Sequence, residues 1–375
     1  MSGKDQTITL LGAGDVAPLR DNPDSIFDQV RDTIKKADIA FCQLEINLSR
    51  RGSPLPQARL AMEAEPKTAA AFKNAGFNVI SFAGNHCLDW GNEAFKDTVD
   101  VLKAQGIRVI GVGNNISEAR TPAIFDIKDT KIALLAYNTI LPQGYWAEPD
   151  RPGCAPMRAF TFYEQIEHDQ PGTACRTHTF AHRGDLKAMI NDIKQARSKA
   201  DVVIISMHWG IHFVPAVIAE YQREMSYAAI DAGADLILGH HAHILKGIEV
   251  YKGKVIFYSL CNFALDLAPA KEMLERPRHK EIMTLNPDWI PDPEYPTYYM
   301  PKDSRKTILA KCIVSGKQVK NVSFLPVMIN KKSQPEILVS DDLRFEEVVR
   351  YIKEITSNQS LPAEFSVKGN EVFIS

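Results

Sequence analysis

Short apolar runs alternate with amphipathic stretches along the first two-thirds of the chain. The apolar runs predict strands at Ile8–Leu11, Ile39–Leu44, Val79–Phe82, Arg108–Gly111, Lys131–Tyr137, Val202–Met207 and Leu236–Gly239. The amphipathic stretches carry apolar residues at helical spacing and predict helices at Ser25–Lys36, Pro66–Ala75, Asn92–Gln105, Gly184–Ser198 and Ile218–Ala232. This alternation favours an α/β fold in which helices cover a sheet of short, buried strands.

The pattern changes after Gly239. The later elements that it predicts are a hairpin of Ile248–Tyr251 and Val255–Tyr258, a strand pair at Ile308–Val314 and Val319–Leu325, a helix at Leu343–Ile355 and a strand near Glu371–Ile374. Two long segments, Glu148–Arg183 and Leu267–Asp303, are predicted as loops, and loops of such length inside compact domains are often functional. The aromatic residues in or near them either line a pocket or pack the loops against the body: Tyr145, Trp146, Trp289, Tyr295, Tyr298 and Tyr299.

Composition narrows the class of protein. The chain has 375 residues, 45% hydrophobic and 24% charged, which is typical of a soluble globular protein. A net charge of −2 gives no global field for nucleic acid or an acidic membrane surface, so an anionic substrate would have to be attracted locally by bound cations. Six scattered cysteines without a CxxC pair do not predict a disulfide framework. The start of the chain shows no signal segment, and no run approaches the ~18 apolar residues of a membrane span, so we expect a cytoplasmic protein.

Residues that can bind metals follow five of the predicted strands. They are Asp15, Glu45, Asn85 with His86, His208, and the run His240-His241-Ala242-His243. Ligands of open α/β sheets bind beyond the carboxyl ends of the strands, so these side chains should converge. Taken alone, Asp15 is a common turn or cap residue and Gly84-Asn85 a common turn dipeptide. Three imidazoles directly after a buried strand have no such structural explanation, and the order of all five clusters favours one metal site.

The mixture of carboxylate, carboxamide and imidazole groups suits Mn, Fe or Zn. Two such divalent ions at about 3.5–4 Å can share a carboxylate, activate a water and clamp the attacking and leaving oxygens of a hydrolysis. The residue types therefore predict a hydrolase with two divalent metal ions.

These motifs resemble the calcineurin-like metallophosphatase superfamily, and more closely its CapA (PgsA) branch, associated with poly-γ-glutamate capsule biosynthesis. The resemblance spans about residues 8–266 and rests on Gly14-Asp15-Val16, Leu44-Glu45-Ile46-Asn47-Leu48, Gly84-Asn85-His86, Asp89-Trp90-Gly91, His208-Trp209-Gly210, Asp231–Asp235, Gly239–His243 and Tyr258–Phe263. It implies a four-layer α/β/β/α sandwich with a small C-terminal α/β appendage. The implied parts are a metallophosphatase-like catalytic domain at 1–266, an insertion or lid at 267–304, and completing strands with the appendage at 305–375.

The resemblance also implies roles for individual residues. The implied ligands are Asp15, Glu45 and His243 for one ion, and the bridging Glu45 with Asn85, His208 and His241 for the other. His86 would protonate the leaving group or stabilise the transition state, and Asp89 would orient it. His240 falls where the superfamily has Gly, and it could replace His241 as a ligand.

Two departures from the family pattern affect the implied metal ligands. Position 17 is Ala17 where the superfamily has His, and the bridging carboxylate is Glu45 rather than Asp, which leaves the first ion one imidazole short. The branch usually has Glu where this chain has His212, which supplies the missing imidazole, contacts substrate, or is an exposed loop histidine. Arg223 and Lys246 are candidate anion contacts or surface charges.

Three functions are compatible with these residues. The first is a metal-dependent hydrolase in which an activated water attacks a phosphoester of a small-molecule or polymeric anionic substrate. The second is a metal-dependent amide hydrolase, for example of γ-glutamyl links. The third is a non-catalytic assembly subunit of a polymer synthase, since a fold alone does not fix a function. We expect no nucleic-acid or membrane partner, and the chain does not reveal its oligomeric state.

Overall fold

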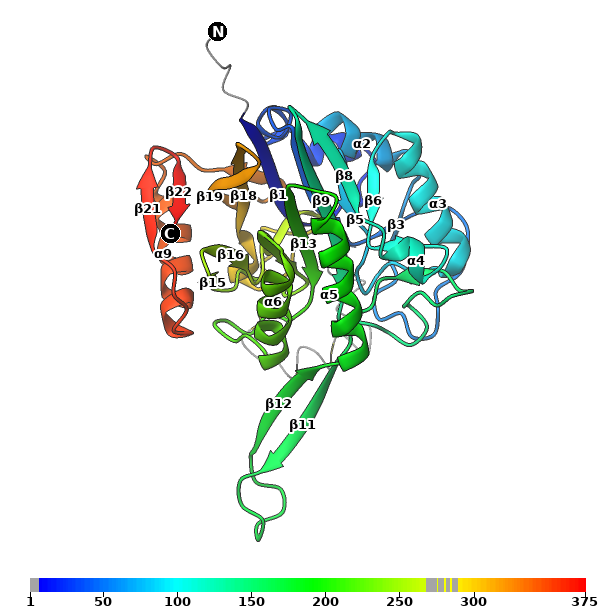
Figure 1. Ribbon diagram of the computed structural model, residues 1–375, viewed down its shortest axis with the longest axis vertical. Helices are drawn as coiled ribbons and strands as arrows, with labels where there is room; N and C mark the ends of the chain where they lie inside the picture. The colour runs from blue at the N-terminus through cyan, green and yellow to red at the C-terminus, as the bar shows by residue number, and fades with distance from the viewer. Residues whose placement is uncertain (1–6, 268–274, 276–279, 281–283, 285–288) are drawn as a thin grey trace.

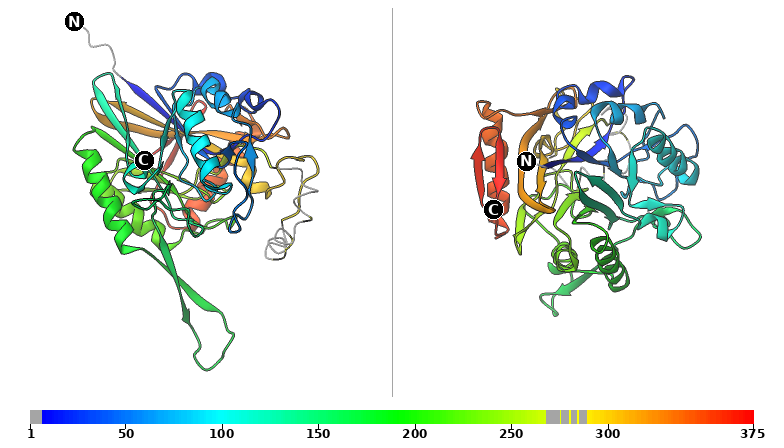
Figure 2. Two further views of the ribbon diagram at one scale, coloured as in Figure 1. Left: turned by 90° about the vertical axis from the view of Figure 1, so that its right-hand side faces the viewer. Right: turned by 45° about the horizontal axis from the view of Figure 1, so that its top comes forward.

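Two β-sheets pack face to face, with helices on both outer faces (Figures 1 and 2). The computed structural model describes residues 7–267, 275, 280, 284 and 289–375, so most of the N-terminal half of the predicted insertion at 267–304 lies outside the described residues. The α/β class is confirmed, and the order of layers is α/β/β/α. One apolar core fills the space between the sheets and under the N-terminal helices, and a second lies between the smaller sheet and its own helices.

The larger sheet has ten strands. Their order is β21 (Phe365–Lys368), β22 (Glu371–Ile374), β19 (Gln318–Ile329), β18 (Lys306–Ser315), β1 (Ile8–Ala17), β2 (Ile39–Leu44), β5 (Val79–Ser81) and β6 (Arg108–Ile110), with β17 (Asn262–Leu265) beside β1 and β20 (Pro335–Ile337) beside β19. Strands β1, β2, β5 and β6 are parallel, so their carboxyl ends lie at one edge. The late strand β18 pairs antiparallel with β1 and extends this sheet.

The smaller sheet has six strands. Their order is β15 (Ile248–Tyr251), β16 (Lys254–Phe257), β14 (Leu236–His240), β13 (Val202–His208), β9 (Thr130–Asn138) and β8 (Ala123–Ile127). The four central strands are parallel, and His208 of β13 is in register with His240 of β14. The parallel register therefore delivers both histidines to the same end of the sheet.

Most of the helices cover the outer faces, whereas α9 (Leu343–Asn358) packs against β19 of the larger sheet and β15 of the smaller one. The described helices are η1 (Pro23–Phe27), α1 (Arg31–Ile34), α2 (Thr68–Ala75), α3 (Gly91–Ala104), α4 (Ile116–Ala119), α5 (Arg183–Arg197), α6 (Glu220–Ala232), η2 (Lys302–Arg305) and α9. Small two-stranded pairs complete the described fold: β3 (Asn47–Leu48) with β4 (Glu63–Ala64), and β7 (Val112–Gly113) with β10 (Gly153–Cys154). The single helix predicted at Ser25–Lys36 is instead η1 and α1, because apolar spacing fixes the buried side but not the type of turn. Among the described helices, none has the length and apolar character needed to cross a membrane.

The prediction of a loop over Glu148–Arg183 was wrong in part. This segment contains a hairpin of β11 (Ala159–Gln165) and β12 (Cys175–Ala181) that projects from the body (Figure 1). Phe160 faces Phe180 across the hairpin with ring centroids 5.7 Å apart, although both side chains are exposed. Because neither face of the hairpin is buried, its strands are not continuous apolar runs like those that predicted the central strands.

A chain that ends at residue 304 should not fold. It would lose β18 and β19, which bury Ile308, Leu309 and Phe324 completely. Each such side chain contributes about 1.5–3 kcal/mol, and a whole domain is stable by only about 5–15 kcal/mol. Thermal unfolding followed by circular dichroism should show no cooperative transition. A chain that ends at residue 363 and lacks only β21 and β22 should keep the transition at a lower Tm; a cooperative transition in the shorter chain would contradict the expectation.

Candidate metal centre

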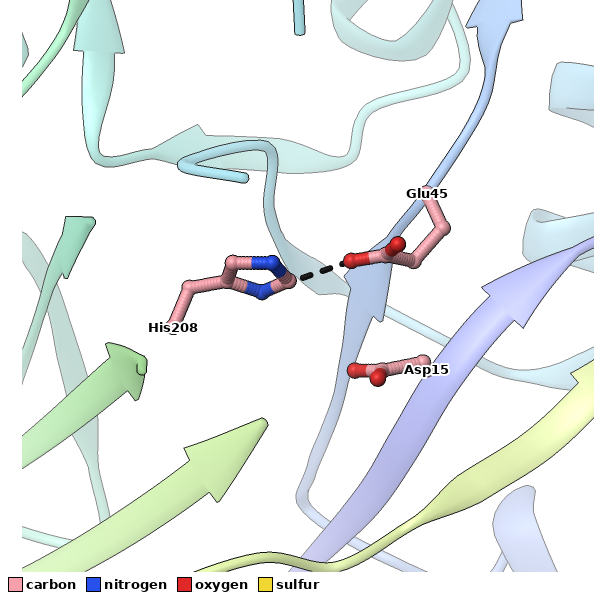
Figure 3. A group of neighbouring side chains, drawn as sticks. All are labelled: Asp15, Glu45 and His208. Atoms are coloured by element: carbon pink, nitrogen blue, oxygen red, sulfur yellow. Dashed lines mark ion pairs between the residues drawn. The ribbon is translucent and has the colours of Figure 1, made fainter. Parts of the chain in front are cut away.

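Three acidic and imidazole side chains meet where strands of the two sheets end. Asp15 lies in β1, Glu45 directly follows β2, and His208 is the last residue of β13. All three are buried, and their potential ligand atoms lie within 4.8 Å of one another. Figure 3 shows the side chains pointing toward one another from separate strands. The convergence predicted from the strand ends is therefore present in the structure.

A close backbone approach positions Asp15. A Cβ on Gly14 would lie 2.0 Å from the carbonyl oxygen of Cys261, so only glycine fits at this position. The backbone N–H of Asp15 donates to that same oxygen at 3.0 Å, and Cys261 has a φ of 65°. The Gly-Asp sequence thus lets β1 lie against the turn before β17 and aims the carboxylate inward.

Two pairs of buried atoms face each other without a hydrogen bond. Nδ1 of His208 lies 3.3 Å from Oε1 of Glu45, and Nδ1 of His240 lies 3.2 Å from Oδ1 of Asp15. None of these four atoms has a hydrogen-bond partner within the described part of the chain. Buried polar atoms without partners cost about 1–3 kcal/mol each. Carboxylate and imidazole lone pairs that face one another fit a divalent cation, which would satisfy both donors at once.

Asn85 joins the second set of implied ligands. Its Oδ1 accepts hydrogen bonds from Nε2 of His208 at 2.6 Å and from Nδ1 of His241 at 3.1 Å. The rings of the two histidines are 4.8 Å apart. The structure therefore brings together Asn85, His208 and His241, as the resemblance implied.

The turn after β14 wraps around Asp15. The backbone N–H of His241 donates to Oδ2 of Asp15 at 3.1 Å, and Nδ1 of His243 lies 3.5 Å from the same oxygen. His241 and His243 have φ values of 84° and 54°, a left-handed conformation that non-glycine residues adopt at a cost. Nδ1 of His243 also donates to Oδ1 of Asn262 at 2.7 Å. Asn262 belongs to the motif Tyr258–Phe263, but the sequence predicted no role for it.

His240 also faces the centre. Its side chain is fully buried, its ring packs against Phe41, and both of its ring nitrogens lack a hydrogen bond among the residues described. The structure thus brings both His240 and His241 to the site, and either can serve as a ligand.

The half-buried His86 forms a dyad with the buried Asp89 at the edge of the cluster. Nδ1 of His86 donates to Oδ2 of Asp89 at 2.6 Å, and Nε2 lies 3.9 Å from Oε2 of Glu45. The hydroxyl of Tyr145 donates to the other oxygen of Asp89 at 2.9 Å. No sequence pattern indicated this contact, because Tyr145 belongs to a segment remote from Asp89.

Three further candidate site residues, His212, Lys246 and Arg223, differ in their surroundings. His212 is not an exposed loop histidine, because its ring packs against His241 with centroids 3.9 Å apart. Lys246 is not a surface charge: it is buried and donates to the backbone carbonyl of Val214. The guanidinium of Arg223 donates to the carbonyl oxygen of Gln359 at 3.1 Å, a contact that ties α6 to the end of α9 rather than to the cluster.

Burial shifts the pKa values of the site. It lowers the pKa of His208 and His241 well below the usual value, and the neighbouring imidazoles lower both further. Burial raises the pKa of Glu45, and the nearby carboxylates of Asp15 and Asp89 add to this effect. The imidazoles are therefore neutral near pH 7, which is the form that binds metals.

The comparisons with known proteins agree with the motifs. The family model described as "Bacterial capsule synthesis protein PGA_cap" matches residues 9–267. The chain is 28% identical to "PGA biosynthesis protein CapA" of Bacillus subtilis over 65% of its length and 57% of that protein. It is 27% identical to "Capsule biosynthesis protein CapA" of Bacillus anthracis over 65% of its length and 54% of that protein. The chain thus spans a little over half the length of these curated relatives, and the predicted resemblance to the CapA branch is confirmed.

Among solved structures, the chain is similar to the calcineurin-like phosphoesterase YfkN of Bacillus subtilis. The identity is 11%, the TM-score is 0.35, and the match covers 95% of this chain and 98% of that one. This likeness is too slight to support a conclusion about the fold beyond the layers described above.

The pH dependence of stability should report on the buried imidazoles. Because the pKa values of His208 and His241 are lowered on folding, the unfolded chain, with imidazoles near pKa 6.5, binds more protons below that pH. The stability from these groups is present above about pH 6.5 and is lost as the pH falls. Glu45 acts in the opposite direction, since its pKa is raised, so the test uses the Glu45→Gln variant.

In metal-free Glu45→Gln protein, the Tm should fall by at least about 2 °C between pH 7.5 and 5.5. Adding His208→Gln should make this dependence shallower, as measured by differential scanning calorimetry. An equal slope in both variants would show that the imidazole does not titrate with folding.

Proposed function

The chain belongs to the bacterial capsule synthesis protein PGA_cap family, and from this premise we propose that it is a metal-dependent hydrolase acting on a phosphoester. The observation that carries the proposal is the pair of unsatisfied contacts, His208 to Glu45 and His240 to Asp15, at the meeting point of the strands. A purely structural protein gains nothing from buried lone pairs that face each other. Two divalent cations, such as Mn, Fe or Zn, would satisfy these atoms.

The proposed metal ligands form two sets. Asp15 and His243 would hold one cation, with His240 as a further imidazole beside Asp15. Asn85, His208 and His241 would hold the other cation, and Glu45 would contribute to both. Cations in these positions lower the pKa of an attacking water and neutralise charge on the substrate. They also provide the positive charge that a chain of net charge −2 lacks for a small or polymeric anionic substrate.

His86 is the proposed general acid. Its Nδ1–H donates to Asp89, which fixes the tautomer and leaves Nε2 facing the side of Glu45 where substrate would lie. From this nitrogen a proton can pass to the leaving oxygen. Tyr145 holds Asp89 from the opposite side and is therefore a positioning residue.

An amide bond is the second candidate target. Its support is the name of the relative in Bacillus subtilis, "PGA biosynthesis protein CapA", because a glutamate polymer is held together by amides. The same ligands and the same acid can serve either bond, since both reactions need a polarised oxygen and an activated water. Substrate assays therefore have to include both classes, and a chain that holds its ions but turns over neither class would favour the role of an assembly subunit.

Protein loaded with Mn²⁺ should hydrolyse an aryl phosphate or phosphodiester, and replacing the acid should slow it. His86→Asn is expected to lower kcat by about 10²–10⁴-fold, the usual contribution of a general acid, with unchanged metal content. His168→Asn, an exposed histidine on the hairpin, is the matched control and should behave as wild type. γ-Glutamyl peptides are assayed in parallel. Turnover of these peptides without turnover of phosphoesters would replace the ester by an amide, and the lack of both would refute the hydrolase.

Tyr145→Phe should lower kcat by about 10-fold while leaving KM and metal content unchanged. A hydrogen bond to a charged group contributes about 1.5–3 kcal/mol, and its loss lets Asp89 and His86 leave their positions. The loss should grow as the leaving group becomes more basic, because only poor leaving groups need the acid. Tyr137→Phe removes a similar bond from a buried tyrosine to Asp192 on α5 and should leave this dependence unaltered. If both variants changed the dependence of kcat on the leaving group equally, Tyr145 would not be a positioning residue.

A further inference from the structure

The first cation of the proposed centre is one imidazole short. Position 17, where the superfamily pattern has His, is Ala17, a fully buried residue at the end of β1. Nδ1 of His240 lies 3.2 Å from Oδ1 of Asp15, whereas Nδ1 of His243 lies 3.5 Å from Oδ2, and it is on this second side that a further donor is sought. The inference below rests on the metal centre of the proposed function, and it concerns the residue that fills this gap.

Backbone hydrogen bonds hold the loop after β13 against the turn that carries His241 and His243. The N–H of Phe213 donates to the carbonyl oxygen of Ala242 at 3.0 Å, and Phe213 adopts a φ of 55°. On the other side, the N–H of Gly210 donates to the hydroxyl of Tyr221 at 2.8 Å. His212 lies between these two anchors, so the framework places its ring against the centre without help from its side chain.

The spacing of the imidazole rings is compatible with two separate ions. Two imidazoles on one tetrahedral ion, with metal–nitrogen bonds of about 2.1 Å, have ring centroids about 5 Å apart. The rings of His212 and His243 are 5.2 Å apart, and those of His208 and His241, which are assigned to the second ion, are 4.8 Å apart. His212 and His241 are only 3.9 Å apart, which is too close for two ligands of the same ion and is typical of packed rings.

The ring of His212 also has an unused donor atom. Its Nε2 is buried and has no hydrogen-bond partner in the described part of the chain. A ring that served only for packing would be better replaced by an apolar one, because a buried nitrogen without a partner costs about 1–3 kcal/mol. The neighbouring Phe213 already provides apolar packing, with its ring 4.9 Å from that of Trp289.

We propose that His212 is a metal ligand that completes the coordination of the ion held by Asp15 and His243, in place of the imidazole missing at position 17. The donor set of this ion is then one carboxylate, the bridging Glu45 and two imidazoles, which suits Zn, Mn or Fe. A carboxylate at position 212, the usual residue of the CapA branch, would occupy the same place with an oxygen donor.

Metal content tests this assignment without any substrate. Wild type, His212→Ala, His212→Glu and the control His168→Ala are loaded with Zn²⁺, dialysed and measured by elemental analysis. Wild type and the control should keep about two ions per chain, whereas His212→Ala should keep about one or bind the weaker ion at least about 10-fold less tightly. His212→Glu should keep both ions. An unchanged ion content and affinity in His212→Ala, or a wild type without ions, would overturn the assignment.

The absorption spectrum of Co²⁺-loaded protein gives a second measurement, which remains decisive if His212→Ala does not fold. Replacing a nitrogen donor by an oxygen donor in His212→Glu should shift and weaken the visible bands of one ion, whereas identical spectra would show that His212 is not a ligand. The two proposals fail separately. A chain that holds both ions through His212 but hydrolyses nothing loses the proposed function only, and an active chain with unchanged metal content in His212→Ala loses only this ligand.

Discussion

The structure depends on carboxylates and imidazoles that are buried together at the ends of parallel strands. Parallel pairing places the ends of β1 and β2 side by side, and it places His208 beside His240 in the facing sheet. Packing the two sheets then removes these groups from water. The free energy of unpaired buried polar atoms is unfavourable by about 1–3 kcal/mol each, so the apolar core must offset this cost wherever no cation does.

The alternation of strands and helices was enough to predict the α/β class and most of the elements. It succeeded because the central strands are buried on both faces and therefore appear as continuous apolar runs. It failed for β11 and β12, whose exposed side chains follow no burial pattern, and for the segment Ser25–Lys36, where burial does not dictate the type of helical turn. Periodicity reports which side chains are buried, and elements that bury little remain invisible to it.

The candidate site could be predicted in part for the same reason. Asp15, Glu45 and His208 lie at or near the carboxyl ends of strands, so the strand pattern alone locates them at a common edge. Tyr145 and Asn262 hold their neighbours through contacts between segments remote in sequence, and only the folded chain reveals them. The strand pattern identifies the candidate ligands of the proposed cations, whereas tertiary contacts identify the groups that orient these ligands.

Part of the backbone strain in the described chain lies in turns next to the same centre. Cys261, Phe213, His241 and His243 all have left-handed backbone angles, and each such residue costs about 1–3 kcal/mol unless its surroundings compensate. All four lie in turns that surround Asp15 or face it across the site. Strained turns and facing lone pairs raise the free energy of the folded chain around Asp15. Cations that bind only the folded chain would lower that free energy. Under the proposed function, metal binding and folding would therefore be coupled, because the buried groups that lack partners are those that a cation would satisfy.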